Sequence, residues 1–156
     1  MGVSLPEVRR GTRTTRADGH IYAACMASRA SNFCLDAADP YAQTMWWAEV
    51  LEDFTVDDSW EMKPGDEECG LTGPDDRYLL FLKVPEPKTV KNRMHMCLRP
   101  TDRPRDEEID RILGLGATLV ADRRQGDRGW VVLADPEGNE FCVLTPYRPS
   151  TEAAAG

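Results

Sequence analysis

Residues Trp130 to Leu144 read WVVLADPEGNEFCVL, and this segment indicates the fold more clearly than any other part of the chain. Apolar residues dominate both of its ends. Between them lie four turn-forming residues, Asp135-Pro136-Glu137-Gly138. The pattern predicts two strands, Gly129–Ala134 and Glu140–Thr145, joined by a tight turn.

A related segment occurs in the first half of the chain. Leu71–Asp75 (LTGPD) precedes Leu133–Glu137 (LADPE) by 62 positions, and Asn32–Leu35 (NFCL) precedes His95–Leu98 (HMCL) by 63 positions. The order of the predicted elements is also the same in both halves. Self-similarity of this kind indicates a duplicated structural unit.

Each half also contains a predicted helix. The helical segments are Tyr41–Leu51 and Asp106–Leu115, and each follows an aspartate, Asp39 or Asp102. An aspartate at this position can accept hydrogen bonds from the free N–H groups of the first turn, so both are predicted as N-caps. Pro40 fits the first helical position, where its missing N–H has no cost.

The elements together predict an α+β fold in which tandem βαβββ modules form curved mixed sheets around a cleft, with the helices outside. The other expected strands are Phe54–Val56, Glu68–Thr72, Arg77–Val84 and Ala117–Ala121. The expected organisation is a poorly ordered basic leader (1–28), a domain (29–146) with module one at 31–84 and module two at 93–145, and a tail (147–156).

Composition excludes several classes of protein. The chain has 156 residues, 41% hydrophobic and 29% charged, as in globular rather than disordered or fibrous proteins. No apolar run approaches the ~20 residues that cross a bilayer, and no secretion signal is present, so we expect a cytoplasmic protein without membrane contact. The net charge of −8 argues against nucleic acid as a partner. Five cysteines without a CxxC pair favour reduced thiols.

Three segments resemble the vicinal oxygen chelate superfamily, also called glyoxalase/bleomycin-resistance/dioxygenase proteins. They are Phe33–Pro40 (FCLDAADP) with Trp46-Trp47, Val90–His95 (VKNRMH), and Trp130–Leu144. The last is the most specific, since an aspartate-proline-acid-glycine turn before the final strand is a hallmark of the superfamily. The resemblance covers about residues 31–146 and is closest to the glyoxalase-like domain branch, common in high-GC bacteria. It implies a small-molecule ligand in the cleft and a chain that can form a homodimer.

The metalloenzymes of this superfamily hold a divalent ion on four side chains, usually two histidines and two glutamates. Carried over one by one, these ligands fall at four positions: Asn32, Leu80, His95 and Cys142. Only His95 keeps the usual type, although Glu140 shares a sheet face with Cys142. We therefore expect no cofactor. If a divalent metal is bound, His95 and Glu140 are the predicted ligands, supported by Cys142 or Asn32.

His95 and Glu140 are also the candidate catalytic residues. Imidazole titrates near neutrality, and we expect the apolar cleft to raise the pKa of Glu140, which would suit a general base. The alternatives are a hydrogen-bonded His95 without a chemical role and an edge carboxylate paired with Arg or Lys.

The predicted ligand-binding residues are Arg93, Trp47, Trp130, Asn32 and Cys142. Arg93 can attract an anion, and the tryptophans can form aromatic walls, with core packing as their alternative. Cys34, Cys97 and Cys142 share the inward parity of their strands, which favours small core side chains over a nucleophile. A thiolate metal site is the other interpretation of these three cysteines.

Two functions fit these observations. The first is a glyoxalase-like binding protein that sequesters or senses a small aromatic or cationic molecule, such as a drug or metabolite. The second is a metal-independent or atypical-metal lyase, isomerase or biosynthetic enzyme, distinct from ordinary glyoxalase I, with His95 and Glu140 as acid and base. Asn32 and Leu80 at ligand positions favour binding.

Overall fold

The computed structural model describes residues 14–15, 21–22 and 28–147, and it divides the chain into two units, Met1–Ala30 and Ser31–Gly156. In the first unit, β1 (Thr14–Thr15) pairs antiparallel with β2 (Ile21–Tyr22). The rest of the predicted leader and tail, except residues 28 and 147, lies outside the described residues. No helix in the described part of the chain is long and apolar enough to cross a membrane.

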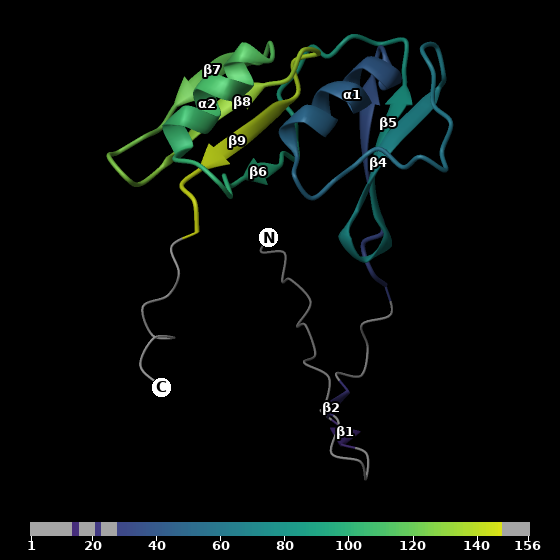
Figure 1. Ribbon diagram of the computed structural model, residues 1–156, viewed down its shortest axis with the longest axis horizontal. Helices are drawn as coiled ribbons and strands as arrows, with labels where there is room; N and C mark the ends of the chain where they lie inside the picture. The colour runs from purple at the N-terminus through teal and green to yellow at the C-terminus, as the bar shows by residue number, and fades with distance from the viewer. Residues whose placement is uncertain (1–13, 16–20, 23–27, 148–156) are drawn as a thin grey trace, which may run out of the picture. The chain divides into compact units, whose positions relative to one another are not determined.

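The second unit begins with a module of one helix and three strands (Figure 1). The elements in chain order are β3 (Asn32–Ala37), α1 (Pro40–Val50), β4 (Glu68–Gly73), the 3₁₀ turn η1 (Pro74–Asp76) and β5 (Arg77–Lys83). β5 lies in the centre, parallel to β3 and antiparallel to β4. At the other edge of β4, where the sequence predicts a strand, Thr55 forms a single bridge with Thr72.

A second module follows in the same unit. Its elements are β6 (Cys97–Leu98), α2 (Arg105–Gly114), β7 (Thr118–Asp122), β8 (Trp130–Ala134) and β9 (Glu140–Leu144). The strand order is β6-β9-β8-β7, and β6 runs parallel to β9. Both modules thus place their first strand beside their last, and the predicted α+β fold of two mixed sheets is confirmed.

The two turns that the sequence comparison aligned occupy equivalent places. Pro74–Asp76 joins β4 to β5, and residues 135–139 join β8 to β9. Gly138 has φ +90°, a left-handed conformation that glycine adopts without strain. The repeat therefore aligned the last two strands of each module, β4 and β5 with β8 and β9.

The helix starts differ from each other. Asp39 caps α1 by accepting a hydrogen bond from Ala42 N at 3.0 Å, as predicted, with Pro40 in the first turn. The prediction that Asp102 caps the second helix is wrong, because α2 begins at Arg105 and Pro104 occupies the cap position. Asp102 is instead bound to Arg103, at 2.8 and 2.9 Å.

A hydrophobic core joins the two modules. Trp47 and Phe81 of module one and Ile112 and Phe141 of module two are among its most deeply buried side chains. The rings of Trp47 and Phe141 meet edge to face, with centroids 5.1 Å apart. Each module alone would leave this apolar face in water.

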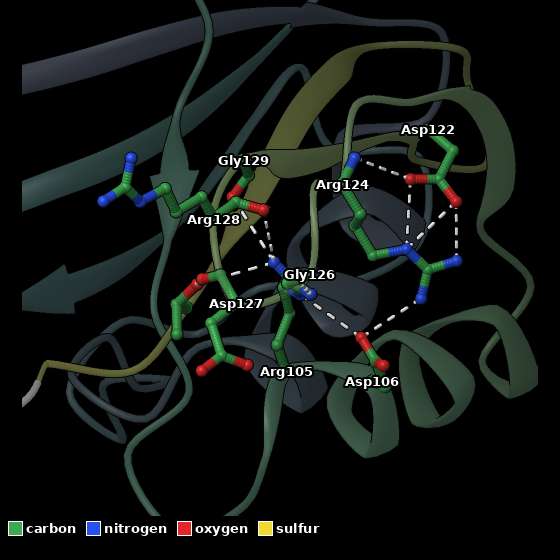
Figure 2. A network of polar contacts seen from close by, with 9 residues as sticks. Arg105, Asp106, Asp122, Arg124, Gly126, Asp127, Arg128 and Gly129 are labelled. Carbon is green, nitrogen blue, oxygen red and sulfur yellow. Dashed lines mark hydrogen bonds and ion pairs between the residues drawn. The ribbon is translucent and has the colours of Figure 1, made fainter.

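A polar network holds the β7–β8 hairpin against the first turn of α2 (Figure 2). Arg105, only 8% exposed, donates to Gly126 O at 2.9 Å and to Arg128 O at 3.3 Å. At the surface, Arg124 pairs with Asp122 and Asp106. Arg128 O also accepts a backbone hydrogen bond from Gln125 N at 3.0 Å, so the guanidinium adds to the hairpin's own bonds and joins the hairpin to α2.

Candidate functional site

A cavity of about 690 Å³ is formed by residues of both modules. Its lining comes from β3 and the following residue (33–38), from the connector between the modules (84, 86–96), and from Glu137 and residues 139–141 at the start of β9; Trp47 of α1 contributes as well. This volume is typical of pockets for small organic ligands, about 300–1,000 Å³.

Large apolar side chains face this cavity while still in contact with water. Phe33 is 38% exposed, Val90 74% and Met94 76%, and all three line the cavity. Exposed apolar surface in a concave site indicates a place where a partner or ligand is buried.

The cavity also carries charged groups of both signs. Asp36, Glu86, Lys91 and the predicted ligand residue Arg93 line it, and none of these four forms an ion pair within residues 28–147. Two acids and two bases balance formally. A ligand that carries a charged group would therefore find a counter-charge of either sign here.

Glu140 lines the same cavity, but its carboxylate already has partners. Its Oε2 accepts from Asn92 N at 2.9 Å and lies 3.1 Å from Lys88 Nζ. Burial alone would raise the pKa of Glu140, but these two interactions together outweigh burial and lower it. The sequence-based expectation of a raised pKa is therefore wrong in direction, because the apolar cleft supplies an ion-pair partner.

The turn that precedes Glu140 is held by the carboxylates of Asp135 and Glu137. Asp135 is buried, and its Oδ1 accepts hydrogen bonds from Glu137 N at 3.0 Å and Asn139 N at 2.8 Å. The carboxylate of Glu137 in turn accepts from Ala38 N at 2.7 Å and Asp39 N at 2.9 Å. The turn thus connects the end of β3 to the start of β9, the two strands that line the cavity.

His95 lies next to two cysteines. The ligand atoms of His95, Cys97 and Cys142 all lie within 4.8 Å of one another. His95 is exposed and lines the cavity, whereas Cys142 is buried. Burial and the neighbouring Cys97 raise the pKa of Cys142 to about 11. Glu140, the other predicted metal ligand, is not part of this group.

The remaining predicted ligand residues lie in different places. Trp47 borders the cavity but is 1% exposed, and its Nε1 donates to Asp135 Oδ2 at 3.2 Å. Trp130, 44% exposed, begins β8 away from the cavity lining. Asn32 begins β3 and its Oδ1 accepts a hydrogen bond from Ser31 Oγ at 2.8 Å. Neither Asn32 nor Cys142 lines the cavity.

Sequence reasoning found Arg93 and His95 in the connector but missed four other connector residues. Lys88 and Asn92 bind Glu140, and Val90 and Met94 supply apolar lining. The available signal was the alternation of apolar and polar residues in Val90–His95, which resembles a strand. The structure begins β6 only at Cys97, so the alternation instead distributes side chains along an irregular wall of the cavity.

Comparison with known proteins gives one family match. The sequence model of the family described as "Glyoxalase-like domain" matches residues 32–144. This range runs from the first residue of β3 to the last residue of β9. No curated protein sequence matches the chain.

Solved structures with the same fold include three with related descriptions. A glyoxalase/bleomycin resistance protein/dioxygenase family enzyme from Burkholderia phytofirmans is 18% identical, covers 74% of this chain and 97% of its own, and has a TM-score of 0.57. The fosfomycin resistance protein FosX from Mesorhizobium loti is 17% identical over 84% of this chain and 100% of its own, with a TM-score of 0.56. A FosX variant from Listeria monocytogenes, in complex with Mn(II) and dihydroxypropylphosphonic acid, is 15% identical over 82% and 98%, with a TM-score of 0.55.

Proposed function

Because the chain belongs to the glyoxalase-like domain family, we propose that it binds a small organic molecule in the cavity lined by β3, the connector and the start of β9. The observation that carries this proposal is the cavity of about 690 Å³ with Phe33, Val90 and Met94 exposed in it. Burial of these side chains by a ligand would contribute about 25 cal/mol per Å² of apolar surface.

The ligand that fits best is mainly apolar or aromatic and carries a charged group. The net charge of −8 attracts cations over long range, whereas the four unpaired charges at the cavity balance. We therefore propose a cationic aromatic molecule. Asp36 and Glu86 are its expected counter-charges, and sequestration or sensing of a drug or metabolite is the expected role.

Titration with two fluorescent dyes tests this proposal. Thioflavin T is cationic and aromatic, and anilinonaphthalene sulfonate is an anionic aromatic molecule of similar size. We expect thioflavin T to bind one site per chain, and Phe33→Ala to weaken binding about fivefold, the equivalent of about 1 kcal/mol of lost burial. The matched control is Met45→Ala, because Met45 is similarly exposed (41%) but lies outside the cavity.

The charge preference has its own control. Asp36→Asn should weaken thioflavin T and leave the anionic dye unchanged, and Arg93→Gln should do the reverse. Equal loss of dye binding in the Phe33 and Met45 variants would contradict the proposed site. Preference for the anionic dye, lost in the Arg93 variant, would keep the site and reverse the sign of the ligand.

The alternative of an enzyme that uses His95 and Glu140 has less support. A general base must be free to accept a proton, and Glu140 is ion-paired with Lys88 and has a lowered pKa. If the protein is nonetheless an enzyme, Glu140→Gln should abolish turnover and keep binding. In a binding protein, the same change should alter affinity alone.

The metal of the fold family does not fit the residues present. A FosX relative holds Mn(II), an ion that prefers oxygen and nitrogen ligands. At the four corresponding positions this chain has Asn32, Leu80, His95 and Cys142, and Leu80 offers no donor atom. Glu140, the carboxylate predicted as a metal ligand, forms an ion pair with Lys88. We therefore propose that ligand binding does not depend on an ion of the Mn(II) type.

We also propose a cytoplasmic homodimer. The four described cysteines Cys34, Cys69, Cys97 and Cys142 are free thiols, as expected in a reducing compartment. The edge strand β7 exposes Leu119 (59%) and Val120 (51%), which supports burial against a second copy. Light scattering should give twice the chain mass, and Val120→Glu should halve it. A monomeric native protein would contradict the dimer.

A further inference from the structure

The donor set of His95, Cys97 and Cys142 is built into the backbone of module two. Cys97 and Cys142 are register partners on the adjacent parallel strands β6 and β9, and directly opposed residues point to the same face of a sheet. The hydrogen bond from Cys142 N to Met96 O, at 2.9 Å, fixes the two strands beside each thiol. His95 precedes Cys97 by two residues, and all three donor atoms lie within 4.8 Å of one another.

These separations are close to what a tetrahedral zinc ion needs. Zn–S bonds of about 2.3 Å and Zn–N bonds of about 2.0 Å place neighbouring donor atoms about 3.5–3.8 Å apart. Small side-chain rotations, without a change of the strands, would bring three atoms from within 4.8 Å to this spacing.

We propose that His95, Cys97 and Cys142 form a binding site for a single thiophilic metal ion, with Zn²⁺ as the ion that fits. Two thiolates and one imidazole are soft or borderline donors, which favour zinc over manganese, magnesium or calcium. His95 and Cys142 stand at two of the four family positions, but the donor set is a different one, because Cys97 is not a family position and no carboxylate belongs to the group.

The proposed zinc site would carry no net charge and would lie at the border of the cavity. Two thiolates neutralise one divalent ion, so a partly buried site bears no net charge, and this limits the cost of burying Cys142. Three protein ligands leave one tetrahedral position for water or a ligand atom, as in zinc sites that are not purely structural. Because His95 lines the cavity, the ion would lie at its border.

Cobalt substitution tests this inference with a spectroscopic readout. The full-length protein is stripped with a chelator, kept reduced with a phosphine in the absence of air, and titrated with Co²⁺. We expect one equivalent to give the near-ultraviolet charge-transfer band of cobalt thiolates and the visible bands of tetrahedral cobalt. Zn²⁺ should displace both, and Mn²⁺ in excess should not.

Single substitutions identify the donors. Cys97→Ser, Cys142→Ser and His95→Ala should each weaken Zn²⁺ binding more than about 100-fold, above the 10- to 100-fold effect of residues that only support a metal ligand. Cys34→Ser is the matched control, because Cys34 is an exposed thiol on β3 outside the group. Far-ultraviolet circular dichroism of each stripped variant verifies the fold.

Several results would overturn the site. These are no charge-transfer band in the reduced protein, an equal loss of affinity in the Cys34 variant, or displacement of cobalt by Mn²⁺ at similar concentration. A Cys97–Cys142 disulfide that persists under the reducing conditions, seen by mass spectrometry as a loss of two hydrogens, would overturn it as well. The dye titration of Phe33→Ala uses no metal, so failure of this site and failure of the proposed ligand cavity are distinguishable.

Discussion

The carboxylate of Glu140 is subject to two opposing influences. Burial favours its protonated form, whereas Asn92 N–H and Lys88 favour the charged form and lower its pKa. A lowered pKa means that Glu140 contributes stability above its ordinary value of 4.5 and that this contribution is lost as pH falls through the folded-state value.

Lys88→Met removes one of these influences and should raise the pKa of Glu140 relative to the native protein. The difference in free energy of unfolding between the two proteins should be largest above about pH 5 and disappear at low pH, where Glu140 is protonated in both. Carbon-detected NMR titration and urea unfolding at several pH values measure the two effects. Lys63→Met, at an exposed lysine without an ion pair among the described residues, is the control. An unchanged pKa would show that Lys88 is not the partner.

Asp135 allows a second prediction at this scale. Its Oδ2 accepts hydrogen bonds from Trp47 Nε1 at 3.2 Å and Asn139 Nδ2 at 3.0 Å, while Oδ1 accepts from two backbone N–H groups. In Asp135→Asn, one of the two oxygens is replaced by an NH₂ group, which would face either the two backbone N–H groups or the side-chain donors of Trp47 and Asn139. We expect a loss of about 1–3 kcal/mol in the free energy of unfolding, measured by urea denaturation. Asp110→Asn, at an exposed helix position, should change it by less than about 0.5 kcal/mol.

Glu140 lies at the cavity as expected, but strand alternation alone does not explain this, since its neighbour Phe141 also lines the cavity and Cys142, on the same face as Glu140, does not. Strand alternation could not identify Lys88 as the partner. Lys88 lies in an irregular connector, and no local pattern specifies where such a segment returns to the sheet. The sequence also could not predict that Cys97 lies beside Cys142, because this depends on the register of β6 against β9.

At the scale of elements, the β7–β8 hairpin depends on a helix residue for its shape. Arg105 begins α2 and donates to the carbonyls of Gly126 and Arg128 (Figure 2). Gly129 has φ +80°, and a Cβ there would lie 2.1 Å from Arg123 O. A side chain at Gly129 would therefore clash with the hairpin backbone, and loss of the guanidinium would remove the hydrogen bonds that join the hairpin to α2.

Arg105→Met should lower the free energy of unfolding by about 1.5–3 kcal/mol, since it removes the charged donor, itself only 8% exposed, of the bonds to the carbonyls of Gly126 and Arg128. Arg124→Met is the matched control: Arg124 pairs only at the surface, with Asp122 and Asp106, where ion pairs contribute about 0–1 kcal/mol. Thermal and urea denaturation measure both variants. Equal losses in the two would show that the buried bonds of Arg105 add nothing beyond surface charge.

The sequence predicted the ranges of the two helices more accurately than their N-cap residues. The predicted ranges Tyr41–Leu51 and Asp106–Leu115 differ from α1 and α2 by one residue at each end. Asp39 was identified correctly, because a proline directly after it marks the first turn. Asp102 was not, because Pro104 and Arg105 shift the start of α2 and the side chain of Asp102 binds Arg103.

At the scale of the whole unit, the repeat predicted the duplicated topology because two strand-and-turn segments recur at nearly the same offset. The contacts that join the modules were not predictable from either half. Trp46 Nε1 donates to Leu115 O at 3.0 Å, and Arg111 Nη1 donates to Glu49 O at 2.8 Å. These side chains lie in different modules, so their partners depend on how the two helices are placed.

The shared core predicts that the two modules unfold together. Phe141 belongs to module two, yet its ring contacts Trp46 and Trp47 of module one, at centroid distances of 6.0 and 5.1 Å. Phe141→Ala should therefore lower the free energy of unfolding by about 3–5 kcal/mol and shift the tryptophan-fluorescence and circular-dichroism transitions by the same amount. Met45→Ala, at an exposed position of α1, should shift neither. Two separate transitions, with only one displaced by Phe141→Ala, would mean that each module folds on its own core. Coincident transitions would mean that the cavity between the modules exists only while both are folded.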